Sequence, residues 1–533
     1  MGERKSVFQF GYRRSADQAT EQPVRRPVVI VGAGPVGLTA AIDLAQRGIA
    51  SVILDDADRI GEGSRAICFS KRTLEIMDRL GLGDRLVEKG VTWKVGKVFL
   101  GEHQVYSFDL LPEAGHRMPA FINLQQYYLE GYLVERAAEL PQIDLRWRNR
   151  VEAVERHAGF VRVTIETPDG TYQLDADWLL ACDGARSKVR DCLSLKFEGH
   201  MFEERFLIAD VRMSAEYPTE RWFWFDPPFH SGQSALLHRQ PDNVWRIDLQ
   251  LGPDADPEEE KKPERVLPRL KRMLGDRKFE LEWVSVYRFN CARLKQFVHD
   301  RVIFVGDSAH QVSPFGARGA NSGIQDAENL VWKLALVLSG EAPPSLLESY
   351  DLERGQAADE NIGHSTRSTD FIAPRTTQER VLRNAVLQLA PHAPFARRMV
   401  NSGRLSVASR YDTPLSMADA EPFGGSARLG LPIPDVPLED REGRKRFLLQ
   451  SLSGDFELLY FKDGARPNVP EGVRLTVIGE DLIDREGIFA ERFDATPGSA
   501  FLLRPDHHLC ARMRRYDGTR VREALSQAKG LAS

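Results

Sequence analysis

Three glycines and one acidic residue near the start of the chain have the types and spacing that dinucleotide binding requires. Gly32, Gly34 and Gly37 follow the pattern G-x-G-x-x-G. The first permits a sharp turn, the second lets the backbone approach a pyrophosphate, and the third lets a helix pack closely on the preceding strand. Pro35 lies inside the same turn, and Asp55 can accept a hydrogen bond from a ribose hydroxyl. The pattern predicts a dinucleotide site, with a purely structural glycine turn as the alternative.

The residues around these glycines predict the elements that would position them. Residues 28–31 are apolar and β-branched, which is typical of a buried parallel strand. Apolar residues then recur at helical spacing until Gly48, and a second apolar run, residues 52–54, ends at Asp55. A helix that begins at the glycines would point its positive N-terminal end at the phosphates. The agreement of strand, helix, second strand and acid favours the dinucleotide interpretation.

Two further polar residues are candidates for the same ligand. Asp183 follows the apolar run 178–182 and precedes Gly184. Read alone, this is also the pattern of an ordinary turn after a strand. Arg65 is the basic residue nearest the predicted pyrophosphate end, and the alternative for it is a solvated surface arginine.

A third stretch combines a strand, an acid and a glycine-rich loop. Residues 302–305 predict a buried strand that stops at Gly306 and Asp307. The loop then leads into a helix with a predicted cap near Asn321 or Ser322. The acid could accept from a sugar hydroxyl, and the helix N-terminus could hold an anion. Simple closure of a strand, loop and helix is the alternative.

Length and charge limit the class of protein. The chain has 533 residues, so two to three domains are expected. Its 72 basic and 77 acidic residues nearly cancel, which argues against nucleic acid or an anionic membrane as the main partner. No apolar run approaches the ~18 residues of a membrane span, and the first residues lack the apolar core of a signal peptide. Five scattered cysteines without C-x-x-C favour a reducing cytoplasm and argue against a metal site or disulfides.

A change of pattern marks an inserted domain at residues 199–289. Alternating apolar and polar residues predict an antiparallel sheet there. In the run 245–251, Arg246 and Asp248 share one face. That face could look into an active site, or it could be the wet face of the sheet. Further candidates to meet a substrate carboxylate, each with an ordinary surface or core role as the alternative, are His230, His238 and Arg239.

The three glycine- and aspartate-containing stretches, in this order, identify a family. The chain resembles the single-component FAD-dependent aromatic hydroxylases (group A flavoprotein monooxygenases), and within them the phenol and 3-(3-hydroxyphenyl)propionate hydroxylase branch. The resemblance implies an α/β fold with a Rossmann-like FAD-binding domain, an inserted antiparallel-sheet substrate domain and a C-terminal thioredoxin-like domain that here lacks C-x-x-C. The expected boundaries are an N-terminal arm at 1–26, the FAD-binding domain with connecting helices at 27–198 and 290–400, the substrate domain at 199–289 and the thioredoxin-like domain at 401–533.

The resemblance also assigns roles to residues. Those assigned to FAD are Gly32, Gly34, Pro35, Gly37, Asp55, Arg65, Gln126, Asp183, Gly306, Asp307, Pro314, Gly319, Ala320 and Asn321. The glycines and Asp55 would hold the ADP half, and Asp183 would touch both FAD and a transient NADPH or NADH. Asp307 would bind the ribityl or pyrophosphate portion, and the loop 314–321 would face the isoalloxazine. Arg246 falls where the family has Arg-x-Tyr, with the arginine near the flavin. Asp248 replaces that tyrosine, which makes it a candidate proton acceptor.

The implied activity is hydroxylation of a phenolic aromatic compound by FAD, NAD(P)H and O2 through a flavin C4a-hydroperoxide. A non-catalytic flavin-binding sensor and a flavin halogenase are alternatives, although the halogenase motif W-x-W-x-I-P is absent from the sequence. A Baeyer–Villiger oxygenase would carry F-x-G-x-x-x-H-x-x-x-W-P, which is also absent. The expected partners are a small aromatic substrate, O2 and a possible second copy of the chain. No nucleic acid, membrane span or metal is expected, and the expected location is cytoplasmic.

Overall fold

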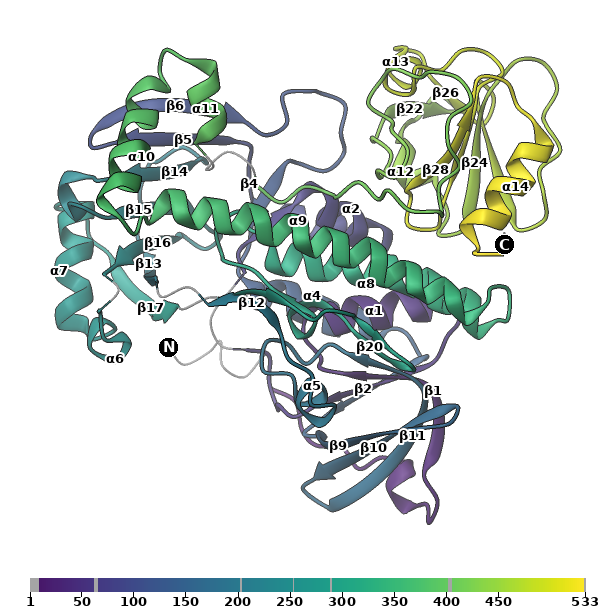
Figure 1. Ribbon diagram of the computed structural model, residues 1–533, viewed down its shortest axis with the longest axis horizontal. Coiled ribbons are helices and arrows are strands. Elements are labelled where there is room, and N and C mark those ends of the chain that lie inside the picture. Colours follow the sequence, from purple (N-terminus) through teal and green to yellow (C-terminus); the bar gives the residue numbers. More distant parts are fainter. Residues whose placement is uncertain are drawn as a thin grey trace.

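A computed structural model of the protein describes residues 9–61, 66–201, 204–252, 254–287, 290–400 and 405–531. Its first layer is a largely parallel sheet at the lower right of Figure 1. The strand order is β19 (Val298–His299), β20 (Val302–Phe304), β11 (Gly170–Ala181), β1 (Val24–Val31), β2 (Ser51–Asp55) and β8 (Ile143–Trp147). The hairpin of β9 (Arg150–His157) and β10 (Phe160–Thr167) joins β11 in antiparallel fashion. This sheet has the Rossmann-like order, with the carboxyl ends of β1, β11 and β20 side by side.

Helices cover this sheet and connect it to smaller elements. They are α1 (Pro35–Gln46), α2 (Lys71–Arg79), α3 (Gly83–Lys89), α4 (Gln126–Ala138) and α5 (Lys188–Cys192). A short sheet in the order β3 (Cys68–Ser70), β7 (Phe121–Asn123) and β4 (Val91–Trp93) lies next to α2, and another has the order β12 (Glu198–Met201), β18 (Asn290–Arg293) and β21 (His310–Gln311). The second short sheet connects the third motif to the inserted domain, because β21 follows the Gly306–Asp307 turn and pairs through β18 with β12, which precedes β13.

The inserted domain is built on a mainly antiparallel sheet at the left of Figure 1. Its order is β17 (Glu280–Tyr287), β13 (Arg205–Arg212), β16 (Val244–Leu251), β15 (Ser234–Arg239), β14 (Arg221–Phe225), β5 (Val95–Leu100) and β6 (His103–Asp109). The sheet therefore extends beyond residues 199–289, since β5 and β6 come from the first part of the chain. The pair of β14 and β5 is parallel. Sequence alternation alone could not reveal this partner.

The two faces of this sheet are covered differently. On the outer face, apolar side chains such as Trp245 and Ile247 pack with α7 (Pro263–Leu274), which follows the short helix α6 (Pro257–Glu260). On the inner face, Phe206 and Phe223 belong to a core cluster that includes Phe315 of the glycine-rich loop. The inner face, which also carries Arg246 and Asp248, is thus directed at the FAD-binding domain rather than at water.

Two long helices cross the molecule and connect the domains (Figure 1). They are α8 (Gly319–Leu338) and α9 (Glu348–Ile372), and α10 (Thr377–Leu389) and α11 (Pro394–Met399) follow them. The end of α9 reaches the inner face of the antiparallel sheet, where Ser234 Oγ donates to the Ile372 carbonyl (3.2 Å). Within the described ranges, no helix combines the length and hydropathy that a bilayer crossing needs.

The C-terminal domain is a separate sheet with helices, at the upper right of Figure 1. The order is β23 (Lys445–Phe447), β22 (Pro437–Asp440), β26 (Leu482–Ile483), β25 (Val473–Ile478), β24 (Phe456–Phe461), β27 (Ala500–Leu503) and β28 (Leu509–Met513). Its helices are α12 (Leu448–Ser451), α13 (Ile488–Phe493) and α14 (Gly518–Ala528). Parallel β24 and β25 followed by the antiparallel pair β27 and β28 give the thioredoxin-like arrangement that the sequence predicts.

Buried charges dock this domain on the long helices. Glu353 of α9 accepts from Arg504 Nη1 (2.6 Å) and from Lys333 Nζ of α8 (2.8 Å). Asp506 accepts from the Trp332 indole N–H (3.1 Å). All of these side chains are almost fully buried. Because an unpaired buried charge is costly, the network fixes the domain against α8 and α9.

The described part of the N-terminal arm is also held against the body. Phe10 stacks on Trp147, with ring centroids 4.5 Å apart. Asp17 is buried and pairs with Arg146 (2.5 Å) and with Arg26. The first aromatic residue of the arm, Phe8, lies outside the described residues.

Candidate active site

The three glycines of the turn between β1 and α1 differ in the space around them. Gly32 has a φ of +103°, and a Cβ there would lie 2.5 Å from the Cys182 carbonyl oxygen. A Cβ on Gly37 would lie 2.0 Å from the Gly32 carbonyl oxygen. At Gly34, a Cβ would meet no described heavy atom within 4 Å. Two glycines therefore close the strand–helix packing, while the third leaves open the path that a pyrophosphate needs.

Asp55 and Pro35 complete this turn. Pro35 is the first residue of α1, so its missing N–H costs the helix nothing. Asp55, the last residue of β2, accepts from the Ala33 N–H through Oδ2 (2.6 Å) and from the Ala57 N–H through Oδ1 (2.9 Å). Burial raises the pKa of this carboxyl group. Asp55 thus shapes the glycine turn itself, and its remaining lone pairs are available to a ribose.

Asp183 offers an unsatisfied buried acceptor beside the same strand ends. Its Oδ2 accepts from the Val189 N–H (3.0 Å), whereas Oδ1 is buried and has no partner among the described residues. Arg190 donates to the Ala185 carbonyl (2.9 Å) and to the Ser308 carbonyl (3.3 Å). The second and third motifs are therefore tied together, and one acceptor is left for a ligand.

Asp326 anchors the Gly306–Asp307 turn from inside α8. It accepts from the Gly306 N–H (3.0 Å), His310 Nε2 (2.6 Å) and Arg354 Nε (2.5 Å). Although burial alone would raise it, the adjacent His310 and Arg354 lower the pKa of Asp326 to about 2. The sequence interpretation did not single out this group. Its only signal was a charged residue next to the apolar stripe of the helix.

The glycine-rich loop and the first turn of α8 face the inserted domain. α8 begins at Gly319 rather than at Asn321 or Ser322, because Arg318 occupies the N-cap position without a side-chain cap. The N–H groups of its first three residues have no acceptor within the helix. Asp307 is exposed, and a Cβ on Gly319 would lie 3.9 Å from its Oδ1. This end of the helix suits a group that carries negative charge.

The side-chain amide of Asn321, a residue predicted to face the isoalloxazine, is fully hydrogen-bonded within the protein. Its Nδ2 donates to the Cys68 carbonyl (2.9 Å) and the Ala317 carbonyl (2.6 Å). Its Oδ1 accepts from the Ser70 N–H (2.9 Å) and Thr73 Oγ1 (2.6 Å). The four hydrogen bonds use the whole capacity of the amide. The side chain therefore holds β3 and α2 against α8, and its backbone N–H is what remains for a cofactor.

Other predicted FAD residues lie around this loop. Pro314 is exposed, and Ala320 is half-buried in the first turn of α8. Gln126 accepts from the Ala66 N–H (2.9 Å) and donates to Glu130 (2.8 Å). Arg65, which precedes Ala66, lies outside the described residues.

The two candidate catalytic residues sit on the inner face of the antiparallel sheet. Arg246 is 2% exposed and forms a bidentate pair with Asp210, through Nε and Nη2 at 2.8 Å each. Asp248 lies beside it, and burial raises the pKa of its carboxyl group to about 6. The thiol of Cys68, on β3, lies within the electrostatic reach of both residues, and burial raises its pKa to about 11. The Cys68 carbonyl is the one that Asn321 binds, so this face meets the start of α8.

The additional polar candidates on the sheet divide between its two faces. Arg239 stacks over Trp245 on the outer face, with its guanidinium carbon 5.8 Å from the ring centroid. His230 Nε2 is 2.7 Å from the Gln250 carbonyl oxygen. His238 is buried on the inner face, directly opposite Arg246.

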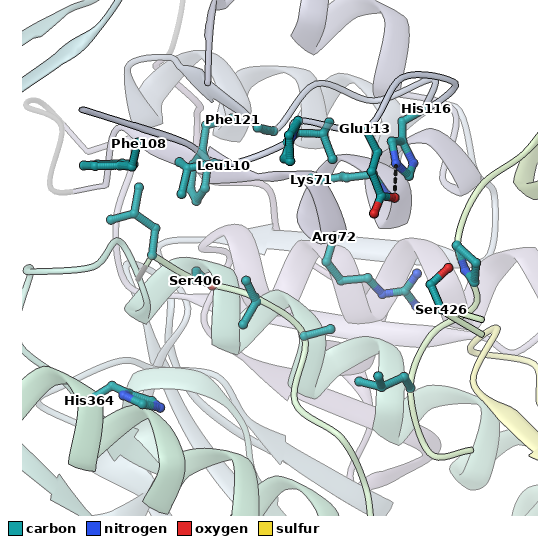
Figure 2. Close-up of a pocket in the computed structure, with 18 of the residues that line it drawn as sticks. Lys71, Arg72, Phe108, Leu110, Glu113, His116, Phe121, His364, Ser406 and Ser426 are labelled. Carbon is teal, nitrogen blue, oxygen red and sulfur yellow. Dashed lines mark ion pairs between the residues drawn. The ribbon is translucent and has the colours of Figure 1, made fainter. Parts of the chain in front are cut away.

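A pocket of about 1110 Å³ opens next to these elements (Figure 2). Phe108, Leu110 and Phe121 gather on one wall, and His364 of α9 lies across from them. Ser406, another lining residue, donates its N–H to the Gly316 carbonyl (2.9 Å). The pocket therefore adjoins the glycine-rich loop. It has apolar and aromatic side chains on one wall and basic residues such as Arg72 elsewhere in its lining, a combination that suits a ring with a polar substituent.

Comparisons with known proteins agree with this geometry. Residues 25–365 match the family model described as FAD binding domain. The chain is 30% identical over 516 residues to the 12-dehydrotetracycline 5-monooxygenase/anhydrotetracycline 6-monooxygenase of Streptomyces rimosus subsp. rimosus, over 91% of this chain and 95% of that one. It is 29% identical over 390 residues to the 3-(3-hydroxy-phenyl)propionate/3-hydroxycinnamic acid hydroxylase of Escherichia coli O81, over 72% of this chain and 69% of that one.

A solved structure shares the fold. The flavin-dependent monooxygenase PieE, in complex with FAD and substrate, matches with a TM-score of 0.81 and 23% identity, over 96% of this chain and 100% of that one. The chain belongs to the FAD-binding-domain family of FAD-dependent aromatic hydroxylases. It is a flavoprotein monooxygenase that binds FAD, which confirms the family and the fold that the sequence predicts.

Proposed function

We propose that this enzyme hydroxylates a phenolic ring with bound FAD, molecular oxygen and a reduced nicotinamide cofactor, either NADH or NADPH. The observation that carries the proposal is the pocket beside the glycine-rich loop, which has Phe108 and Phe121 on one wall and is joined to the loop by the Ser406–Gly316 hydrogen bond. When bound, FAD supplies the redox chemistry that delivers one oxygen atom of O2 to the ring. The protein holds the cofactor, orients the ring and excludes water.

The residues present fit FAD. Gly34 leaves open space where a side chain would stand, and Asp183 Oδ1 is a buried acceptor without a described partner. In the proposed arrangement, Gly34 and Asp55 hold the ADP half and Asp183 accepts from the cofactor. Asp307 and the N–H groups at the start of α8, which have no acceptor within the helix, would receive the ribityl and flavin portions, where the helix end favours negative charge.

The inner face of the sheet supplies the groups that would handle the substrate. Arg246, neutralised by Asp210, would form a wall of the flavin site. Asp248 is the proposed proton acceptor, because a carboxyl group whose pKa lies at about 6 is ionised at neutral pH yet close enough in pKa to bind a proton. A hydroxylase of phenols needs such a group near the ring oxygen.

The pocket volume favours a substrate larger than a single ring. About 1110 Å³ exceeds the ~300–1000 Å³ typical of drug-sized ligand sites. The Streptomyces rimosus relative is named for tetracyclines, whereas the Escherichia coli relative is named for phenylpropionate compounds. A panel of phenols should therefore run from one ring to four fused rings.

The test combines cofactor consumption with product analysis. Purified holoenzyme should oxidise NADH or NADPH faster when a phenol from the panel is present, and the matching methyl ether should stimulate less. Oxygen from ¹⁸O₂ should appear in the aromatic ring, one atom for each nicotinamide oxidised. Halogenated product in the presence of halide would instead assign a halogenase. No product from the whole panel, with FAD bound, would favour a sensor.

We also propose a homodimer in a cytoplasmic, reducing compartment. Large apolar side chains are exposed on α10 and α11, including Leu382 at 60% and Phe395 at 53%, which supports a contact between copies. The five cysteines are all free, which supports the compartment. Light scattering on the wild type and on Leu382→Glu would test the dimer.

A further inference from the structure

One row of inner-face residues crosses the antiparallel sheet from strand to strand. Arg221 of β14 pairs with Gly96 of β5. Its neighbour Trp222 pairs with Leu237, which places Arg221 opposite His238 of β15. His238 pairs in turn with Arg246 of β16, and Arg246 with Asp210 of β13. Asp248 lies two residues beyond Arg246 on the same face.

The charges in this row do not balance pair by pair. Arg246 and Asp210 neutralise each other through two hydrogen bonds. Arg221 is 8% exposed and forms no ion pair within the described part of the chain. Its Nη1 is buried and has no hydrogen-bond partner there, and burial lowers its pKa. A buried guanidinium without a counter-ion is costly, so a ligand is the natural partner for it.

Asp248 is the complementary group. Its Oδ1 is buried and has no partner among the described residues. Its Oδ2 is 3.9 Å from His238 Nε2, too far for a hydrogen bond. Burial raises the pKa of Asp248 overall, and the positive charge of Arg221 opposes this rise. The two groups influence each other but do not pair directly.

A phenolic hydroxyl matches this arrangement better than other polar groups. It can donate to Asp248 Oδ1 and accept from Arg221 Nη1 at the same time, so that one oxygen satisfies both. A substrate carboxylate would satisfy Arg221 but would face the carboxylate of Asp248, which is repulsive. The row also lies on the face that meets the glycine-rich loop, because Phe206 of β13, on that face, packs edge-on against Phe315 of the loop, with ring centroids 4.6 Å apart.

We propose that Arg221 and Asp248 together bind the phenolic hydroxyl of the substrate and ionise it. The proton of the O–H bond passes to Asp248 Oδ1, and the phenolate oxygen stays hydrogen-bonded to Arg221 Nη1. No other bond changes in this step. The resulting phenolate is a more electron-rich ring than the phenol. The inference rests on the proposed function and names the residues that select its substrate class.

The experiment uses FAD-loaded enzyme and three coloured probes: 4-nitrophenol, its methyl ether 4-nitroanisole, and 4-nitrobenzoate. Binding is followed by flavin fluorescence, and the fraction of bound nitrophenolate by its absorbance. Wild type should bind 4-nitrophenol at least about tenfold more tightly than 4-nitroanisole, the value of one charged hydrogen bond. Arg221→Met should lose that preference and the phenolate signal while binding 4-nitroanisole within about twofold of wild type. Asp248→Asn should lose the phenolate signal.

Arg212→Gln is the matched control, because Arg212 lies on the same sheet but is exposed and pairs with Glu282. It should behave as wild type. Urea denaturation of the variants checks their folding. Arg221→Met should unfold at no lower urea concentration than wild type. Arg246→Met, which leaves Asp210 without its ion-pair partner, should unfold at a lower urea concentration. An Arg221→Met protein that unfolds earlier would give Arg221 a structural role and overturn the proposal.

Three binding results would also overturn it. They are equal wild-type affinity for 4-nitrophenol and 4-nitroanisole, an unchanged 4-nitrophenol preference in Arg221→Met, and a wild-type preference for 4-nitrobenzoate that Arg221→Met abolishes. The last would assign a carboxylate anchor. Failure of the proposed function is a different result, since it appears as absent phenol-dependent hydroxylation by wild type regardless of how these probes bind.

Discussion

The same substitution should have opposite consequences at two glycines of the first motif. Gly34 has an extended backbone with a φ of −76°, and a Cβ there would meet no described heavy atom within 4 Å. A Cβ on Gly37 would lie 2.0 Å from the Gly32 carbonyl oxygen. Alanine therefore fits the folded protein at position 34 and clashes with backbone at position 37. Only the first of these changes isolates cofactor binding from folding.

The magnitudes follow from this difference. Gly34→Ala should change the free energy of unfolding of the FAD-free protein by less than ~1 kcal/mol, and the change should be stabilising, since alanine restricts the unfolded chain. With FAD present, the methyl group would crowd the pyrophosphate at a cost of about 1–3 kcal/mol. That cost corresponds to a roughly 5- to 150-fold weaker Kd. Gly37→Ala should lose both folding stability and FAD.

The assay is a fluorescence titration of FAD-stripped protein with FAD, paired with urea denaturation of the same sample. Gly252→Ala is a suitable control, because a Cβ there also meets no described heavy atom within 4 Å and the residue lies far from the glycine turn in the sequence. A Gly34→Ala protein that binds FAD as tightly as wild type would refute the reasoning, since the open space would then not be the path of the pyrophosphate.

Three other predictions concern buried charges and the charges proposed to hold FAD. Because the pKa of Asp248 is raised to about 6, kcat/KM should fall as the pH drops through about 6, and a pH–rate profile of Asp248→Asn should lack that limb. Asp307→Ala should reduce FAD retention after gel filtration and lower the stability of the FAD-free protein less than Asp55→Ala does, since Asp307 is exposed whereas Asp55 also holds the glycine turn. Arg504→Met should lower the free energy of unfolding, measured by urea denaturation, by about 3–5 kcal/mol, because it removes the cation nearest to the buried Glu353 carboxylate.

Each of these has a contrary outcome. An Asp248→Asn profile that keeps its acid limb would assign that limb to another group. Equal loss of stability in the two FAD-site variants would make Asp307 a structural residue. An Arg504→Met protein as stable as wild type would show that neither Glu353 nor Asp506 depends on Arg504 for its compensation.

The local parts of the site could be predicted from the sequence. The roles of Gly32 and Gly37 depend on a strand and a helix that are adjacent in the chain, so their spacing already indicates a turn and a close packing. The strand predicted at residues 28–31 forms the second half of β1 (Val24–Val31). The start of α8 lies before the predicted position, because a helix with no side-chain cap at Arg318 has no capping residue to mark it in the sequence.

Groups that depend on distant partners could not be predicted in this way. The sequence does not indicate that the Asn321 amide forms hydrogen bonds with β3 and α2, or that Asp326 accepts from the Gly306 N–H. Both contacts join segments that are far apart in the chain. Nor does it reveal that β5 joins the inserted sheet beside Arg221.

The sequence alone thus determined the family, the glycine turn between the first strand and helix, and the presence of Arg246 and Asp248 on one face of one strand. The tertiary structure decided which way that face looks and which charges in it are paired. Strand alternation defines two faces but not their surroundings. Arg221 and Arg246 look alike in the sequence, and only the packing of neighbouring strands pairs one with Asp210 and leaves the other without a described counter-ion.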